Sequence, residues 1–142
     1  MNPPIRSEQD RLALIQGVVD GTIDMIATDH APHSLEEKSK GLKGSLNGIV
    51  GLETAFPILY THLVKNNIIT LEKLVELMCV NPRKRFNLGN NGYTLWNLEK
   101  SYKITANELR SKGKSTPFDG MEVYGELHMV VIEDKVVYKK EN

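Results

Sequence analysis

The sequence predicts an α/β fold, and three observations support this fold class. A segment with helical spacing, residues 7–21, is followed at once by a short apolar strand at residues 23–28. A charged loop then leads into further helical segments that continue to about residue 89. The last third of the chain, from residue 90, alternates in the manner of β-strands.

The first helix carries both a start signal and a stop signal. Ser7 is followed three residues later by Asp10, which resembles a capping box. Apolar side chains then recur at helical spacing, at Leu12, Ile15 and Val19. Asp20-Gly21 predicts the end of this helix.

The strand at residues 23–28 ends in a cluster of groups that can carry chemistry. Asp29, His30 and His33 follow it within five positions. In α/β folds the end of a strand is where catalytic and metal-binding side chains collect. A carboxylate with imidazoles can bind a divalent metal or move protons near neutral pH. A polar loop in which Asp29 merely caps a helix is the alternative.

The middle of the chain predicts a mobile loop and three helices. Residues 34–47 are rich in charge and glycine and predict a mobile surface loop. A helix with Pro57 near its start should run to about Lys65, and a second should begin after Thr70. The spacing of the second helix predicts four apolar side chains that point inward, Leu71, Leu74, Leu77 and Met78. Pro82 suits the first turn of a third, short helix.

Residues 1–89 contain a single clear strand, which cannot form a parallel sheet alone because its backbone groups would stay unpaired. We therefore expect residues 1–89 to be the end of a larger sheet or barrel, truncated at its N-terminus. Residues 121–138 resemble a β-hairpin. The expected organisation is thus 1–89 from a barrel and 90–142 from a β-rich segment.

The composition argues against some partners. The 142 residues include 18 Lys+Arg and 18 Asp+Glu, so no basic excess is present to neutralise phosphates. No apolar run approaches membrane-spanning length, and the one cysteine, Cys79, lies in an apolar context that favours core packing. We expect a soluble, cytoplasmic chain that binds neither nucleic acid nor membrane.

Several segments together resemble the C-terminal part of a dihydroorotase of the stand-alone bacterial type. Dihydroorotases are cyclic amidohydrolases of pyrimidine biosynthesis that interconvert N-carbamoyl-L-aspartate and dihydroorotate. The most specific segment is Ala27-Thr28-Asp29-His30-Ala31-Pro32-His33. The other matching segments are residues 1–6, 20–24, 48–57, 81–82 and 111–118.

The resemblance implies the C-terminal portion of a metal-dependent (β/α)₈ barrel with part of a small β-domain. Residues 23–28 would be the last barrel strand, with Asp29 at the catalytic face. In the family this aspartate ligates one of two zinc ions and transfers the proton from the attacking water to the leaving nitrogen. Asp29 is therefore the predicted catalytic and metal-binding residue.

The resemblance also implies a substrate site. His33 corresponds to a histidine that contacts the substrate carboxylate, and Asn2 to an asparagine beside the substrate ring. Asn47 and Gly48 correspond to a backbone clamp on the pyrimidine, although Leu46-Asn47 stands where the family usually has Pro-Phe. His30 corresponds to a supporting residue.

The family's other metal ligands and its substrate-binding arginine lie upstream of anything in this chain. A full barrel needs about 250 residues, so we expect the fragment to be inactive alone and to need an N-terminal half of the same enzyme. Two alternatives remain. One is another cyclic amidohydrolase, a hydantoinase or allantoinase. The other is a non-catalytic partner of aspartate transcarbamoylase.

Overall fold

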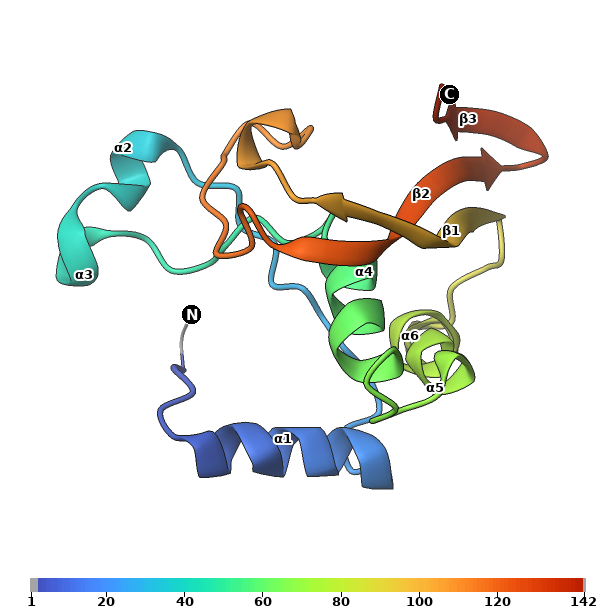
Figure 1. Ribbon diagram of the computed structural model, residues 1–142, viewed down its shortest axis with the longest axis horizontal. Helices are drawn as coiled ribbons and strands as arrows, with labels where there is room; N and C mark the ends of the chain where they lie inside the picture. The colour runs from blue at the N-terminus through green and yellow to red at the C-terminus, as the bar shows by residue number, and fades with distance from the viewer. Residues whose placement is uncertain (1–2, 142) are drawn as a thin grey trace. The chain divides into compact units, whose positions relative to one another are not determined.

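The computed structural model describes residues 3–141, which form two compact units. One unit comprises the residues up to 55 together with residues 103–121. The other comprises residues 56–102 together with the residues from 122 onwards. Figure 1 shows the order of helices and strands along the chain. The predicted division at residue 89 refers to the parts of a complete barrel and stays a prediction.

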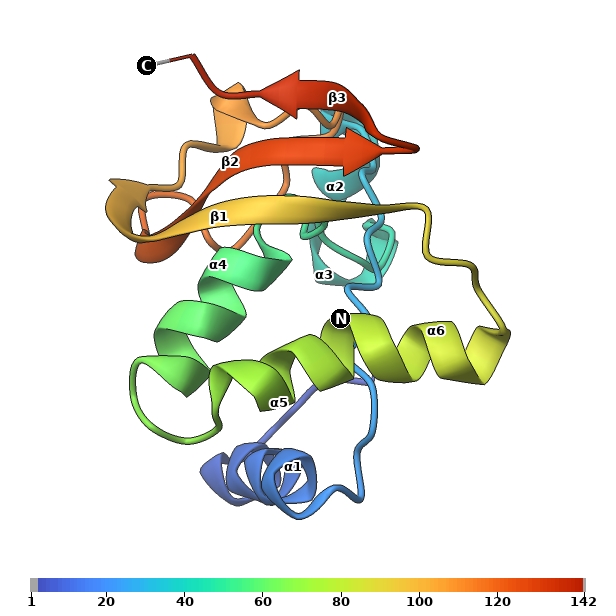
Figure 2. The ribbon, with the colours of Figure 1, turned by 90° about the vertical axis from the view of Figure 1, so that its right-hand side faces the viewer.

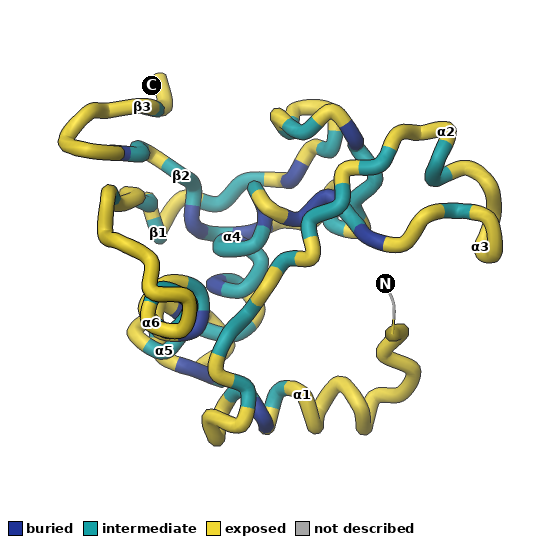
Figure 3. Tube along the Cα trace, turned by 180° about the vertical axis from the view of Figure 1, so that it is seen from behind, coloured by how far each residue is buried: buried dark blue, intermediate teal, exposed yellow. Residues whose placement is uncertain are grey.

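The first unit begins with helix α1 (Glu8–Asp20), as the capping signal predicted. The Ser7 hydroxyl accepts from the Asp10 N–H, the Asp10 carboxylate accepts from the Ser7 N–H, and Gly21 ends the helix at φ 87°. Only Gly17 is buried in α1, which Figure 3 shows as exposed along most of its length. Leu12 and Val19 are 50% and 46% exposed and Ile15 is half-buried, so residues 3–141 cover the apolar face predicted from their spacing only in part.

The strand predicted at residues 23–28 does not form, and this prediction is wrong for the chain as it stands. The segment is extended, but the structure pairs it with no neighbouring strand in the described range. One isolated parallel bridge follows it, between His30 and Ile49. Because a strand forms only where its backbone N–H and C=O groups pair with a neighbouring strand, an extended segment without such a neighbour stays irregular.

The predicted mobile loop at residues 34–47 instead contains two short helices, α2 (Leu35–Lys38) and α3 (Gly41–Gly44). Ser34 and Glu37 form a capping box at the start of α2, in which each side chain accepts from the other's backbone N–H. This start signal is present in the sequence, but the high charge and glycine content of residues 34–47 favours the interpretation as a loop. The rest of the unit, residues 103–121, contains one 3₁₀ turn, η3 (Ala106–Glu108).

The second unit contains the three predicted helices. Helix α4 (Ala55–Leu59) continues into the π-helical η1 (Tyr60–Val64), with Pro57 buried in its first turn. Thr70 caps α5 (Leu71–Val75), which continues into the π-helical η2 (Glu76–Val80). Helix α6 (Asn81–Phe86) follows directly, with Pro82 in its first turn. Cys79 is exposed, so its predicted core position is wrong.

Three strands form an antiparallel sheet in this unit, ordered β1 (Gly92–Lys103), β2 (Glu122–Ile132), β3 (Lys135–Lys139). Figure 2 shows β2 in the middle of the sheet. The predicted hairpin is confirmed as β2–β3, with Val130 opposite Tyr138. Gly92 fits because a Cβ there would lie 2.1 Å from the Val131 carbonyl oxygen.

The core of the second unit lies among its helices and where α4 and η1 meet the sheet. Leu74 and Leu77 are fully buried on the face of the second helix that the sequence predicted to point inward. Phe56 packs against Trp96 and Tyr60, with ring centroids 4.3 and 5.8 Å away. The Tyr124 N–H donates to the Thr61 hydroxyl across 2.8 Å, which ties β2 to η1.

Candidate functional site

Asp29 occupies an unusual backbone position. Its φ is 46°, in the left-handed region that residues with a Cβ seldom adopt and that aspartate tolerates better than most. The residue is exposed, and its carboxylate makes no hydrogen bond or ion pair with the other residues that the structure describes. The carboxylate is therefore free to bind a cation or accept a proton.

The backbone around Asp29 is held by residues on both sides of it. The His30 N–H donates to the Thr28 hydroxyl across 3.3 Å. The Ala31 N–H donates to the Ile49 carbonyl across 2.9 Å. Gly48 approaches so closely that a Cβ there would lie 2.4 Å from the Ala31 Cβ, and its φ of 108° also requires glycine. Residues 48–49 thus pack directly against the loop that carries Asp29.

His30 is a junction between three segments. Its Nδ1 accepts from the N–H groups of Gly51 and Leu52, at 3.3 and 3.2 Å. A neutral ring whose Nδ1 accepts carries its proton on Nε2, and Nε2 lies 3.4 Å from the Ser111 hydroxyl oxygen. The network therefore assigns the Nε2–H tautomer, with Ser111 accepting from it.

Glu53 completes this network. Its carboxylate accepts from the Ser111 hydroxyl and from the N–H groups of Arg110 and Ser111, at 3.3, 2.9 and 3.1 Å. Gly113 packs closely against the loop that carries Asp29 and His30, because a Cβ there would lie 2.5 Å from the backbone of Pro32. Residues 110–113 therefore hold the loop that carries Asp29 and His30.

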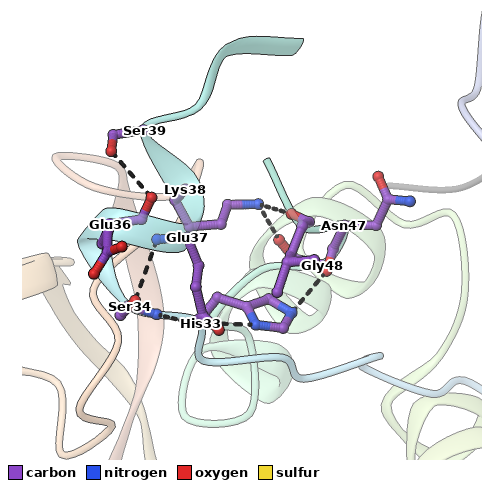
Figure 4. A network of polar contacts seen from close by, with 9 residues as sticks. His33, Ser34, Glu36, Glu37, Lys38, Ser39, Asn47 and Gly48 are labelled. Carbon is purple, nitrogen blue, oxygen red and sulfur yellow. Dashed lines mark hydrogen bonds and ion pairs between the residues drawn. The ribbon is translucent and has the colours of Figure 1, made fainter. Parts of the chain in front are cut away.

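A second network surrounds His33 (Figure 4). Its Nε2 lies 3.0 Å from the Asn47 carbonyl oxygen, and its Nδ1 lies 3.7 Å from the Glu37 carboxylate. The Lys38 ammonium donates to the carbonyls of Leu46 and Gly48, each at 2.8 Å. The structure thus brings His33, Asn47 and Gly48 together.

Backbone and hydroxyl hydrogen bonds from Ser34 lower the pKa of the Glu37 carboxyl below its ordinary value of 4.5. Burial opposes this shift, and the charges of His33 and Lys40 add to it. Glu37 therefore stays ionised near neutral pH and holds the start of α2.

The described residues do not make a metal site by themselves. Within residues 3–141, no group of three or more His, Cys, Asp or Glu side chains could hold a metal ion. Asp29 offers one carboxylate, whereas His30 and His33 direct their ring nitrogens into the two networks. This residue set fits one ligand of a metal centre and not a whole centre.

Sequence reasoning identified some of these residues and missed others. Asn2 lies outside the described residues, so its predicted role stays a prediction. Lys38, Glu53 and Ser111 were missed as parts of the networks. Lys38 directly follows the Ser34–Glu37 capping box, and that signal could have placed Lys38 on a helix. Nothing local in the sequence pairs Ser111 with His30.

No protein-family model matches the chain. Several curated proteins match its sequence. It is 46% identical over 150 residues to a dihydroorotase from Pediococcus pentosaceus, covering 99% of this chain and 35% of that protein. It is 49% identical over 148 residues to a dihydroorotase from a Geobacillus species, with the same two coverages. The chain belongs to the dihydroorotase family.

This family member spans about a third of the length of its curated relatives, 35%, which agrees with the expected C-terminal portion. Among solved structures, an L-hydantoinase from Arthrobacter aurescens superposes with a TM-score of 0.90 at 33% identity, covering 100% of this chain and 34% of that one. A D-hydantoinase from a Thermus species gives 0.89 at 22% identity, covering 98% and 33%, which shows the fold alone.

The predicted fold class is confirmed by these neighbours, which are (β/α)₈-barrel amidohydrolases of a metal-dependent superfamily. The dihydroorotase-family chain has the α/β fold of a partial barrel with a small antiparallel sheet. Among residues 3–141, no helix is both long enough and apolar enough to cross a membrane.

Proposed function

We propose that this chain is the C-terminal part of a dihydroorotase, which interconverts N-carbamoyl-L-aspartate and dihydroorotate in pyrimidine biosynthesis. The observation that carries the proposal is identity of 46–49% to several proteins named dihydroorotase over 99–100% of the chain. The likeness to the L-hydantoinase is weaker in sequence, at 33% identity. Dihydroorotate is therefore the favoured substrate over hydantoin.

Asp29 is the proposed catalytic residue. A carboxylate within hydrogen-bond reach of the reacting amide can take the proton of the attacking water and deliver it to the ring nitrogen that leaves. The Asp29 carboxylate is exposed and has no partner among residues 3–141, which supports this role. We also propose zinc as the metal of the complete enzyme, with Asp29 as the ligand that residues 3–141 supply.

The substrate contacts are proposed for His33, Asn47 and Gly48, together with Asn2. The hydrogen bond between the His33 ring and the Asn47 carbonyl supports a common site for His33, Asn47 and Gly48. It holds an imidazole, which can become a cation, beside the backbone of residues 47–48. An anionic carboxylate of the substrate would compete with that carbonyl for the His33 Nε2–H.

The proposal is tested by a chimaera in which this chain replaces the matching part of the Geobacillus relative. We expect the chimaera to hydrolyse dihydroorotate and the chain alone to be inactive. The Asp29→Asn variant should lose about 10²- to 10⁴-fold in kcat. Asp134→Asn is the matched control, since Asp134 is also exposed and has a φ of 60°.

Three outcomes would count against the proposal. They are a folded chimaera without activity while the intact Geobacillus protein is active, an Asp29→Asn variant with full activity, or hydrolysis of hydantoin or allantoin in preference to dihydroorotate. A non-catalytic role beside aspartate transcarbamoylase would instead require stable binding to that enzyme with no activity in the chimaera. The presence of Asp29 favours the catalytic role.

A further inference from the structure

Three consecutive carbonyls of the segment 46–48 are bound by two side chains of the segment 33–38 (Figure 4). Lys38 binds the carbonyls of Leu46 and Gly48, the first and third of the series. His33 contacts the carbonyl of Asn47 between them. The two side chains therefore fix the orientation of successive peptide groups in the loop that the proposed function assigns to substrate.

The Lys38 contacts are the stronger of the two sets. An ammonium group offers three donors, and a charged donor binds a carbonyl more strongly than a neutral one. The Lys38 side chain is half-buried and the Gly48 peptide is buried, so water competes less for these bonds. Lys38 therefore acts as a clamp with two points of attachment.

The base of this clamp is itself fixed. Lys38 is the last residue of α2, whose start is held by the capping box. The Ser45 hydroxyl donates to the Lys38 carbonyl across 2.8 Å, and the Leu46 N–H donates to the Glu37 carbonyl across 3.2 Å. Helix α2 and residues 45–48 are thus joined by a backbone bond and a side-chain bond in addition to those of the ammonium.

The arrangement matters for ligand binding because the His33 contact is the exchangeable one. A substrate carboxylate that takes the His33 Nε2–H releases the Asn47 carbonyl, whereas Lys38 keeps its bonds to the carbonyls on either side. A trans peptide holds its C=O and N–H in opposite directions, so fixing these carbonyls also fixes where the neighbouring N–H groups point.

We propose that Lys38 is a positioning residue for substrate recognition, holding the 46–48 backbone in place while His33 exchanges Asn47 for the substrate carboxylate. This inference rests on the proposed function. It predicts that loss of the ammonium weakens substrate binding and leaves the chemical step nearly unchanged. A lysine that served only to stabilise the fold would lower the amount of folded protein and leave KM unchanged.

The kinetic test uses the chimaera with Lys38→Met, which keeps the chain length of the side chain and removes the charge. We expect KM for dihydroorotate to rise about tenfold with kcat within about twofold, as uniform binding loss requires. Lys38→Arg should restore part of the loss, because a guanidinium also donates to two acceptors. Lys43→Met is the control, since Lys43 is exposed on the neighbouring α3.

A second measurement does not depend on activity. Amide hydrogen exchange of the 142-residue chain should be faster by about tenfold in peptides covering 45–48 for Lys38→Met, and unchanged there for Lys43→Met. Unchanged exchange, or a fall in kcat with constant KM, would overturn the proposal. An inactive unsubstituted chimaera would count against the proposed function, and the exchange comparison would still decide whether the clamp exists.

Discussion

The Nε2 atom of His30 lies 3.4 Å from the hydroxyl oxygen of Ser111, although the two residues are 81 positions apart in the chain. His30 directly follows Asp29, so this contact connects the proposed catalytic loop to the segment that follows η3. The same ring accepts two backbone N–H groups through Nδ1. A single imidazole therefore joins three stretches of the first unit.

Replacement of His30 by alanine should destabilise this unit. The change leaves the N–H of the buried Gly51 without its partner, and an unpaired buried polar group costs about 1–3 kcal/mol. The Ser111 hydroxyl loses its contact with the ring and keeps its bond to the Glu53 carboxylate. Urea unfolding gives the free energy. His62→Ala is the control, because His62 is exposed, and should change stability by less than about 0.5 kcal/mol.

The coupling between His30 and Ser111 can be measured separately. In a double-mutant cycle with Ser111→Ala, we expect an interaction energy of at least about 0.5 kcal/mol, as for residues in one hydrogen-bond network. Additive effects of the two substitutions would contradict the contact.

Replacement of Gly113 by alanine should also be costly, for a steric reason. The new Cβ would lie 2.5 Å from backbone atoms of Pro32 and His33, and backbone cannot rotate away as a flexible side chain can. We expect a loss of about 1–3 kcal/mol in urea unfolding. Gly51→Ala is the matched control, because the nearest atoms to its new Cβ lie at 3.8 Å. Equal stability of the two variants would refute the close approach.

The stability of α2 should depend on pH through Glu37. Its folded-state pKa is lowered below 4.5, first by the backbone N–H of Ser34 and then by the Ser34 hydroxyl. A carboxyl with a lowered pKa contributes stability that is fully present above its unfolded value and is lost as pH falls through its folded value. The α2 cap should therefore weaken below pH 4.5.

Two-dimensional NMR of the Ser34 amide during acid titration measures this directly. The amide signal should move with a midpoint below 4.5, and Glu37→Gln should abolish the movement, since glutamine accepts the same bond without titrating. Glu36→Gln, one position earlier, should leave the titration intact. A midpoint at or above 4.5 in the unsubstituted chain would contradict the assignment.

Local signals in the sequence were sufficient to predict the helices. They were not sufficient to predict contacts between distant segments. Ser7 and Thr70 cap α1 and α5 as their residue types predict, and Leu74 and Leu77 are buried as their spacing predicts. These features depend on neighbours within a few positions. The extended segment 23–28 failed as a strand because strand formation depends on partners that the pattern of that segment cannot supply.

The networks of the site show the same limit. Glu53 binds Ser111 across 58 positions, and neither residue stands out in its own neighbourhood. Lys38 looks like any lysine in a charged loop until α2 places it opposite residues 46–48. The sequence thus indicated Asp29 and His33 through a recognisable segment, whereas the residues that hold them required the fold.

The backbone strain at Asp29 predicts that substitutions there will affect stability and activity differently. At φ 46°, a residue with a Cβ pays about 1–2 kcal/mol relative to glycine, and aspartate and asparagine pay less than alanine. We therefore expect Asp29→Gly to be at least as stable as the unsubstituted chain in urea unfolding, Asp29→Asn to be equal, and Asp29→Ala to be the least stable. Substitutions at Asp134, with φ 60° in the β2–β3 turn, should follow the same order.

In the chimaera, all three Asp29 variants should lose activity whatever their stability, whereas those at Asp134 should retain it. An Asp29→Gly variant that is clearly less stable would show that the carboxylate holds the loop, and would weaken the case that this strained position is kept for chemistry.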